Sequence, residues 1–490
     1  MVKVKHPDEI AFAGDYNLPR IDLYNHKGQA IDLKNIVHEL NIYESIYKNA
    51  ITGSIVVVDA NNFIGKMEIQ GLERLSFKLE TPGSGVFIDA SMETGDPFHV
   101  YKISDRKQVN DNLTLFTLHF GSREFMRNIR TKVSQAYDSR LDMSVMSIFK
   151  DKEYLDSRKN LYYEPTGNSF KMVIPNLRPF DAINLIAKRA MPERSKGVGY
   201  YFYETTQGFN FKSWDNMCSV DGKIMRKPKQ KFYYMPMNIN DEVAISNKFM
   251  GPSGKGGKIE HEYRSVENYS FVNNFHDVAA NTALGTYGHR VITYNLFEKT
   301  RYESDYNYHT QFDSSIHVDN EGSYTDAGKY AVVDAKVDFD NEKNVSDYAE
   351  SRVSLQASTK FLHDNDVGMY GIDSFNDSST TGQKVSQNNQ VLHGTLLKLI
   401  VKGQTYINAG DVIEFEIHDD MNSEVERTID PRFGGKYVVV NVRHQVGNSQ
   451  YKMVLECAKD SSFLPMAPGS TQWSTHKQGA HISTYEEDQR

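Results

Sequence analysis

The chain contains 490 residues, a length that favours two to four domains over one compact core. Its net charge of -8 argues against general binding to polyanions such as nucleic acids. With only two cysteines, Cys218 and Cys457, the sequence excludes a disulfide framework and a cysteine-based zinc site, and assembly in a reducing cytoplasm is expected. No run approaches the roughly 18 apolar residues of a membrane span, so no membrane partner is expected.

The first strand-rich region covers residues 17–122 and follows an N-terminal arm at residues 1–16. Alternating apolar and polar residues, interrupted by Asn, Pro and Gly, predict a tube-like antiparallel β-barrel domain here. The polar residues 104–112 are expected to connect its last two strands. The predicted strands are residues 42–60, 72–80, 98–103 and 113–120.

The pattern changes after Ser122, where apolar residues three and four apart predict helices at residues 123–135 and 143–152. A third helix is expected at residues 179–190, because Pro179 suits the first turn of a helix. Extended structure is predicted at residues 169–177 and in a hairpin at residues 199–214, with its turn near Gln207 and Gly208.

These helices place residues 123–217 in a helix-containing α+β domain, to which we also assign residues 291–387. Most of that second part, residues 301–387, is a polar insertion rich in Asp, Ser and turn residues. One helix is predicted within it, at residues 348–358. The sequence does not indicate a role for this insertion.

A second tube-like antiparallel β-barrel domain is expected from residues 218–290 together with residues 388–460. Apolar strands flank a small turn at residues 407–411, and a hairpin is predicted around Gly447 and Asn448. The last residues, 461–490, are expected to be a flexible C-terminal tail. Further strands are predicted at residues 231–237, 263–275 and 288–297. The predicted fold class is therefore α+β and mainly β: two barrels, a helix-containing domain and insertions.

Two loop-like features were candidates for binding sites, and both favour a structural interpretation. The glycine-rich residues 251–258 have Gly257 where a phosphate loop needs lysine, and residues 259–261 do not predict the helix that must follow. A basic cluster overlaps this segment and could face an acidic partner or nucleic acid, but a solvated loop is favoured. The cluster consists of Lys223, Arg226, Lys227, Lys229, Lys231, Lys248, Lys255 and Lys258.

The remaining polar residues show no pattern of catalysis or metal binding. The 16 histidines have no zinc-site spacing, and His261, His276 and His289 are expected to be satisfied or surface residues within strand-like segments. The acidic residues 303–319 and 334–347 lack the register of a calcium loop. No carboxylate pair or nucleophile motif stands out. We therefore assign no catalytic, cofactor-binding or metal-binding residue, and we expect no cofactor.

The order of these elements resembles the baseplate central hub protein of T4-like contractile-tailed phages, which is related to the hub part of type VI secretion spike proteins. The likeness covers most of residues 20–460 as pattern and order, without long identities. The matching segments are residues 42–82 (first barrel, with the linker NFIGKM at 62–67), residues 179–190 (short helix), and residues 394–415 with 435–455 (C-terminal barrel half).

The resemblance implies a structural protein of the virion tail baseplate, assembled in the host cytoplasm. In that family three subunits form a ring, each with two similar barrels, which joins the sixfold tail tube to the threefold spike and leaves an axial channel for DNA. The implied partners are further copies of the chain, the cell-puncturing tail spike, the tail tube protein and baseplate wedge proteins, with DNA only in transit. No enzymatic activity is implied. A peptidoglycan-degrading tail enzyme and a monomeric adhesin-like module remain alternatives.

Overall fold

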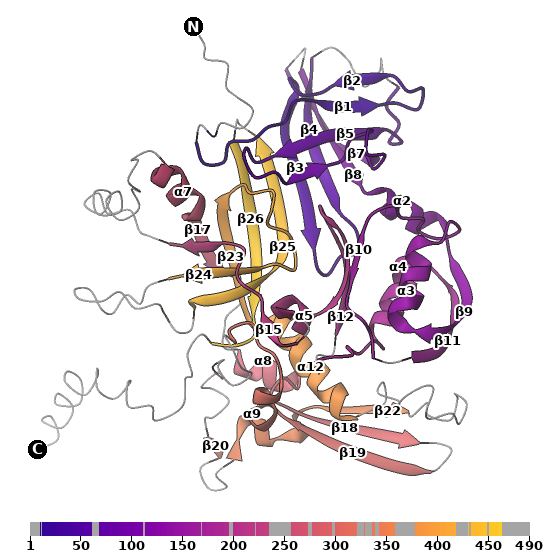
Figure 1. The fold of residues 1–490 in the computed structure, drawn as a ribbon, viewed down its shortest axis with the longest axis vertical. Coiled ribbons are helices and arrows are strands. Elements are labelled where there is room, and N and C mark those ends of the chain that lie inside the picture. Colours follow the sequence, from indigo (N-terminus) through magenta and orange to yellow (C-terminus); the bar gives the residue numbers. More distant parts are fainter. Residues whose placement is uncertain are drawn as a thin grey trace, which may run out of the picture.

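Strands dominate the computed structural model, which confirms the expected α+β, mainly β fold class. Figure 1 shows two neighbouring groups of strands with helix-containing parts attached to them. The predicted linker at residues 62–67 and the tail after Ser462 lie outside the described residues. The structure describes residues 10, 12–60, 68–110, 113–167, 169–195, 199–220, 222–234, 256–272, 277–295, 299–320, 328, 336–338, 343–357, 378–417, 430, 433–447 and 450–462.

The first strand group, here the N-terminal barrel, is an antiparallel sheet in the order β3-β4-β8-β7-β5-β1-β2, with β6 beside β5. The expected connection at residues 104–112 is wrong, because β7 continues to Asn110 and pairs with β8 along this polar stretch. Backbone hydrogen bonds, which need no apolar side chains, hold this half of the strand. The strands are β1 (Ile21–Tyr24), β2 (Ala30–Asp32), β3 (Val37–Ser45), β4 (Thr52–Asp59), β5 (Arg74–Glu80), β6 (Phe87–Asp89), β7 (Phe98–Asn110) and β8 (Leu113–Gly121).

The second strand group, here the C-terminal barrel, closes into a ring. Its strands follow the order β16-β24-β25-β26-β23-β17, and a β-bridge between Tyr233 and Ser265, just before β17, leads back to β16. The predicted hairpin at Gly447 is confirmed, since β25 and β26 pair up to Gly447 opposite Gln450. The strands are β16 (Lys231–Tyr233), β17 (Val266–Phe271), β23 (Thr395–Lys402), β24 (Val412–Glu416), β25 (Gly435–Gly447) and β26 (Gln450–Lys459).

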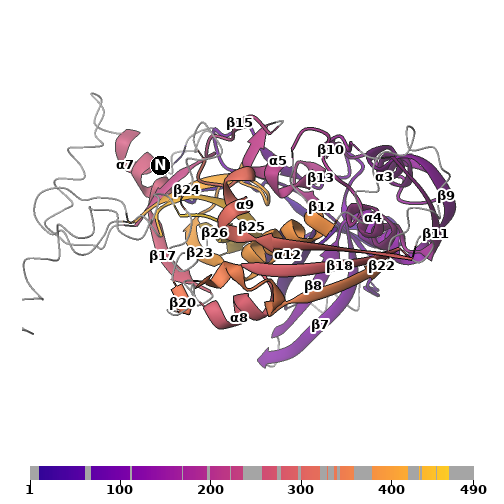
Figure 2. The same ribbon diagram turned by 90° about the horizontal axis from the view of Figure 1, so that it is seen from below.

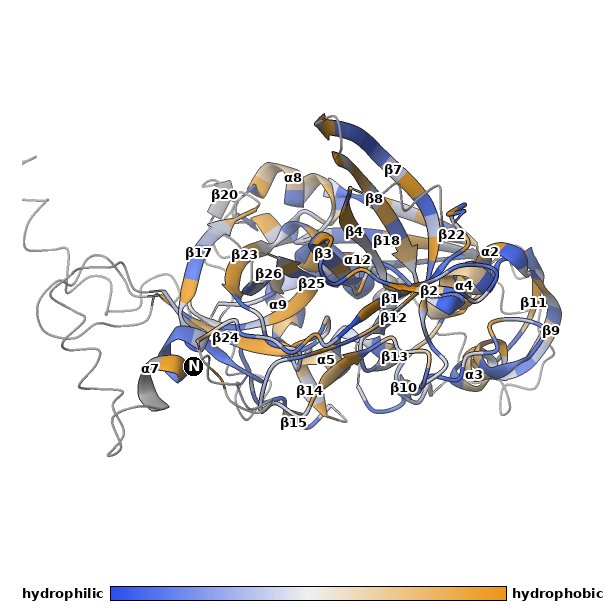
Figure 3. Ribbon diagram, turned by 90° about the horizontal axis from the view of Figure 1, so that it is seen from above, coloured by the Kyte–Doolittle hydropathy of each residue, from blue (hydrophilic) through white to orange (hydrophobic). Residues whose placement is uncertain are grey.

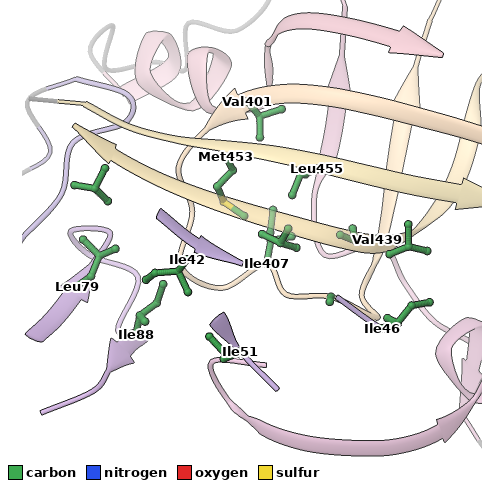
Figure 4. Close-up of a cluster of buried hydrophobic side chains, with 14 of the residues drawn as sticks. Ile42, Ile46, Ile51, Leu79, Ile88, Val401, Ile407, Val439, Met453 and Leu455 are labelled. Atoms are coloured by element: carbon green, nitrogen blue, oxygen red, sulfur yellow. The ribbon is translucent and has the colours of Figure 1, made fainter. Parts of the chain in front are cut away.

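The two barrels belong to one sheet because β25 also pairs with β3, antiparallel, from Asn441 opposite Ser45 to Gly447 opposite Glu39. Buried apolar side chains of both barrels form one continuous cluster. Figure 4 shows part of it, with Ile42 of β3 near Met453 of β26. Burial of this apolar surface is the main stabilising contribution at the joint.

The α+β part has its own hydrophobic core beside the N-terminal barrel. The predicted helices at residues 143–152 and 179–190 and the hairpin at residues 199–214 are confirmed. The helix predicted at residues 123–135 is too long, because extended residues from Thr131 lead into a strand. The elements are α2 (Arg123–Arg130), β9 (Val133–Arg140), α3 (Leu141–Lys150), β10 (Leu161–Tyr163), β11 (Ser169–Leu177), α4 (Pro179–Ala187), β12 (Tyr200–Thr205), β13 (Gly208–Ser213), α5 (Trp214–Cys218), β14 (Ser219–Val220) and β15 (Ile224–Met225).

The insertion, together with the preceding strand β18, forms a small sheet in the order β19-β18-β22, which is covered by the long helix α12. The helix predicted at residues 348–358 is wrong: a 3-10 turn ends at Ser351, and the alternating sequence VSLQA forms β22. The elements here are α8 (Val278–Ala283), β18 (Gly288–Asn295), β19 (Thr300–Asn307), α9 (Tyr308–Gln311), η1 (Phe312–Ser314), β20 (Lys336–Asp338), β21 (Lys343–Asn344), η2 (Val345–Asp347), η3 (Ala349–Ser351), β22 (Val353–Ala357) and α12 (Ser378–His393).

Candidate functional site

The arrangement of strands repeats between the two barrels. In each barrel a 13-residue strand forms a hairpin with the following strand, β7 with β8 and β25 with β26. An eight-residue strand flanks each hairpin, β4 beside β8 and β23 beside β26. Beyond these lie β3 and β17. The order β3-β4-β8-β7-β5 of one barrel therefore matches the order β17-β23-β26-β25-β24 of the other.

The repeat extends to an irregularity in register. The pairing of β3 with β4 shifts by one residue between Val37 and Glu39. The pairing of β17 with β23 shifts in the same way between Val266 and Asn268. Such a bulge leaves one residue of a strand without a partner. Closing a sheet into a barrel does not require a bulge at this position, so its presence at the equivalent position of both barrels supports a repeat. The barrels are thus two versions of one unit.

A buried carboxylate holds three parts of the chain together at the joint between the barrels. Glu44 of β3 accepts hydrogen bonds from the backbone nitrogens of Thr206, at 2.8 Å, and Ala409, at 3.0 Å. Thr206 lies in the turn between β12 and β13, and Ala409 lies in the turn that the sequence predicts at residues 407–411. Glu44 therefore links the N-terminal barrel to both the α+β part and the C-terminal barrel.

Lys159 lies between two buried carboxylates where the N-terminal barrel meets the α+β part. Its Nζ is 3.2 Å from Glu124 Oε2 and 2.5 Å from Glu204 Oε1. Burial disfavours the charged amine, but the two carboxylates raise the pKa of Lys159. The side chains of Glu124 and Glu204 have no exposed surface, so a glycosidic bond cannot reach this carboxylate pair. The cluster is structural.

A second buried polar cluster lies at the end of β26. His317 Nδ1 is 3.2 Å from Asp460 Oδ2, and His317 Nε2 is 2.9 Å from the carbonyl oxygen of Phe312. Trp214 Nε1 donates to the same carboxylate oxygen at 3.1 Å. Because both ring nitrogens face oxygen acceptors, the imidazole is protonated on both. Burial raises the pKa of the neighbouring Cys218 thiol, which is therefore no nucleophile.

This cluster predicts that stability decreases as the pH rises from about 5 to about 8. Burial lowers the pKa of His317 but Asp460 raises it more, so the net pKa is above 6.5 and its stabilising proton is lost as the pH rises through the folded-state value. Burial raises the pKa of Asp215 to about 7, so between roughly pH 4 and 7 the folded chain holds a proton that the unfolded chain has released. The pKa of Asp460 is lowered, so the stability that this carboxylate contributes is lost only in acid, below its usual pKa of about 4.

The check is the midpoint of thermal unfolding as a function of pH, with Asp215→Asn as the comparison. The asparagine side chain at position 215 is uncharged at every pH. Its amide oxygen can still accept the hydrogen bond from Gln387, which donates to Asp215 Oδ1 at 3.1 Å. We expect a flatter pH profile for the variant. Identical profiles for the two chains would contradict the assignment to Asp215.

Three of the five described members of the basic cluster found in the sequence have partners within the chain. Lys229 and Lys231 form ion pairs with carboxylates at 2.8 Å each. Arg226 Nε donates to the backbone oxygen of Asn216 at 2.7 Å. The remaining members are Lys223 and Lys227, which are exposed, and Lys248, Lys255 and the side chain of Lys258, which lie outside the described residues. The described members are consistent with a solvated loop.

The other sequence candidates fall at separate places. His289 is buried in β18 with its Nε2 2.7 Å from Ser354 Oγ, but its buried Nδ1 has no hydrogen-bond partner among the described residues, so this histidine is only partly satisfied. His261 lies in the helix α7 (Gly256–Arg264), so its predicted strand is wrong, as is the absence of a helix at residues 259–261. Residue His276 and the glycine-rich residues 251–255 lie outside the described residues.

Two carboxylates of the acidic segment at residues 303–319 form ion pairs within the chain. Asp305 accepts from Arg290, and Asp319 pairs with Lys459 at 2.9 Å. Within the described parts of the chain, no three His, Cys, Asp or Glu side chains are grouped so that they could hold a metal ion. No helix in those parts is long and apolar enough to cross a membrane.

Comparison with known proteins decides what this fold is. No family model and no curated protein matches the sequence. Among solved structures, the 43 kDa tail protein of prophage MuSo2 from Shewanella oneidensis aligns with a TM-score of 0.50 and 7% identity, covering 91% of this chain and 99% of that one. The chain has the fold of a phage tail protein.

Two further solved structures align with this chain at lower scores. A tail protein from Neisseria meningitidis aligns with a TM-score of 0.47 and 8% identity, over 91% of this chain and 97% of that one. The E. coli c3393 protein, a type VI secretion component described as similar to T4 tail proteins, aligns with a TM-score of 0.38 and 6% identity, over 88% and 76%. At the level of fold, the resemblance to tail hub proteins drawn from element order is confirmed.

Proposed function

We propose that this chain is a structural virion protein and that three copies form the central hub of a phage tail baseplate. The ring would join a sixfold tail tube to a threefold spike and leave an axial passage for DNA. Its partners would be the cell-puncturing spike, the tube protein and the baseplate wedge proteins. The function is then geometric, and the chain needs no catalytic residue or cofactor.

The observation that carries this proposal is the repeated barrel. Three chains contain six equivalent barrels, which suits contact with a hexameric tube. Among the described residues the α+β part and the insertion occur once per chain, so a trimer carries three of each, which suits contact with a threefold spike. Cyclic symmetry also closes the contacts between copies into a ring. The tail-protein fold supports the same conclusion.

The mass in solution tests the proposal. Static light scattering of the purified chain is expected to give about three times the 56.0 kDa of one chain over a wide range of concentrations. The mass of a single chain at every concentration would contradict a ring that assembles by itself. In that case clearing of purified peptidoglycan by the chain would support the alternative, a wall-degrading tail enzyme.

A further inference from the structure

A partly buried lysine in the α+β part has no polar partner. Among the described residues, Lys212 of β13 forms no hydrogen bond and no ion pair. Its Nζ lies 5.7 Å from the centre of the Tyr162 ring, which belongs to the neighbouring strand β10. Because a partly buried ammonium without a partner costs stability, such a group is a candidate for binding a ligand.

The carboxylates near Lys212 are already engaged. Asp411 attracts the amine but forms an ion pair with Lys229 at 2.8 Å. Glu164 also attracts the amine, but its Oε2 accepts a hydrogen bond from a backbone nitrogen at 2.8 Å. Burial and the neighbouring Arg226 lower the pKa of Lys212 to about 8. The fold therefore brings three cations close together, and one of them is left without a carboxylate.

Exposed cationic and apolar side chains lie next to these three cations. Helix α5 leads directly from β13 to the hairpin of β14 and β15, where Val220 and Ile224 are 41% and 70% exposed. Tyr162 is 45% exposed. Figures 2 and 3 show β10, β13 and β15 on one side of the molecule, away from the projecting end of β7. We call this side the basic surface, and it consists of Tyr162, Lys212, Val220, Lys223, Ile224, Arg226, Lys227 and Lys229.

We propose that the basic surface binds an acidic segment of another protein, with a carboxylate on Lys212 and apolar side chains on Tyr162 and Ile224. The inference goes beyond the proposed hub function and does not depend on a ring. Charge complementarity selects an acidic partner. The aliphatic Val220 and Ile224 favour a polypeptide over a nucleic acid, because phosphates offer them no apolar contact. Only the fold brings Lys212 and Tyr162 to the basic cluster, which by itself is consistent with a solvated loop.

Binding of a fluorescent peptide to the full chain, measured by anisotropy, tests the proposal. The peptide alternates glutamate with phenylalanine and leucine, and its counterpart carries glutamine in place of glutamate. We expect the chain to bind the glutamate peptide, and Lys212→Met to bind it about tenfold more weakly because one charge-assisted contact is lost. The matched control is Lys152→Met, which removes the same charge at an exposed position outside the basic surface. This control should bind as the unchanged chain does.

Thermal unfolding shows whether Lys212 also has a structural role. Since its charge has no partner among the described residues, Lys212→Met should leave the unfolding midpoint unchanged or raise it. A residue that lowers affinity for the peptide without lowering stability acts in binding. A lower midpoint for Lys212→Met than for Lys152→Met would assign the lysine to the fold and overturn the proposal.

The remaining outcomes are also decisive. Equal binding by Lys212→Met and Lys152→Met, equal binding of the two peptides, or no binding of either peptide overturns the proposal. If a DNA duplex binds and the glutamate peptide does not, the basic surface belongs to a nucleic acid instead. None of these results changes the mass in solution, so the proposed ring is tested separately.

Discussion

Replacing Lys159 with methionine is expected to lower the free energy of unfolding by about 3–5 kcal/mol, the usual cost of leaving buried charges without a partner. Methionine retains most of the volume of lysine, so loss of packing contributes little. The variant leaves Glu124 and Glu204, both without exposed side-chain surface, facing each other without a cation. Part of the lost stability should return near pH 5, where the carboxylates can bind protons. Denaturant unfolding at about pH 7 and pH 5 measures both effects.

The matched control is Lys152→Met, an exposed lysine in the same loop. A surface substitution of this kind changes stability by less than about 1 kcal/mol. The expected difference between the two variants thus isolates the buried cluster. If Lys159→Met were no more destabilising than Lys152→Met, the two carboxylates would not depend on the lysine charge.

The second large effect is expected for Gly410→Ala in the turn that precedes β24. Gly410 has a φ angle of +85°, which disfavours residues with a side chain, and a Cβ atom there would lie 2.0 Å from the hydroxyl oxygen of the buried Tyr203. Backbone strain and the steric clash together should cost about 3 kcal/mol or more. Because Tyr203 lies in β12, the clash also separates the C-terminal barrel from the α+β part.

Gly28→Ala separates the two contributions. Gly28 has a φ angle of +80°, but no atom lies within 4 Å of the position of a Cβ atom. Only the backbone strain remains, which should cost about 1–2 kcal/mol. Thermal unfolding of the two variants measures the difference. Equal losses at Gly28 and Gly410 would show that contact with Tyr203 contributes nothing.

The elements that the sequence predicted well have a strong local signal. In β23 every second residue is buried over all eight positions, and three of these four residues are apolar, Leu397, Leu399 and Val401. In α4, proline occupies the first turn, and the buried apolar residues Phe180, Ile183 and Ala187 follow at spacings of three and four. Such elements depend on neighbours in sequence, so local patterns identify them.

The elements that were missed depend on distant contacts. Helix α12 has the sequence SSTTGQKVSQNNQVLH, which has few apolar residues and no clear apolar face. Its small residues allow close packing instead: Gly382 lies against the side chain of Tyr306, and the buried Ser386 donates to the backbone oxygen of Thr286 at 2.7 Å. Strand β22 was predicted as part of a helix at residues 348–358, although its sequence VSLQA alternates as strands do, and it pairs with the distant strand β18.

The joint between the two barrels could not be predicted from the sequence for the same reason. Its recognition requires the pairing of β3 with β25, and Asn41 is 402 residues from its hydrogen-bond partner Arg443. The sequence contained one usable signal for the buried charges, because Glu204 follows four aromatic residues in β12, a position that usually implies a buried partner. The identity of those partners, Lys159 among them, depends on the tertiary structure.

The pairing of β3 with β25 also has a consequence for synthesis. At about 5–20 residues per second, a ribosome needs roughly 20–80 s to add the residues between these two strands. During that time the N-terminal barrel can form its own hairpins, but β3 waits for a neighbour that does not yet exist. We therefore expect nascent and prematurely terminated chains, rather than finished ones, to be the forms that need protection by chaperones.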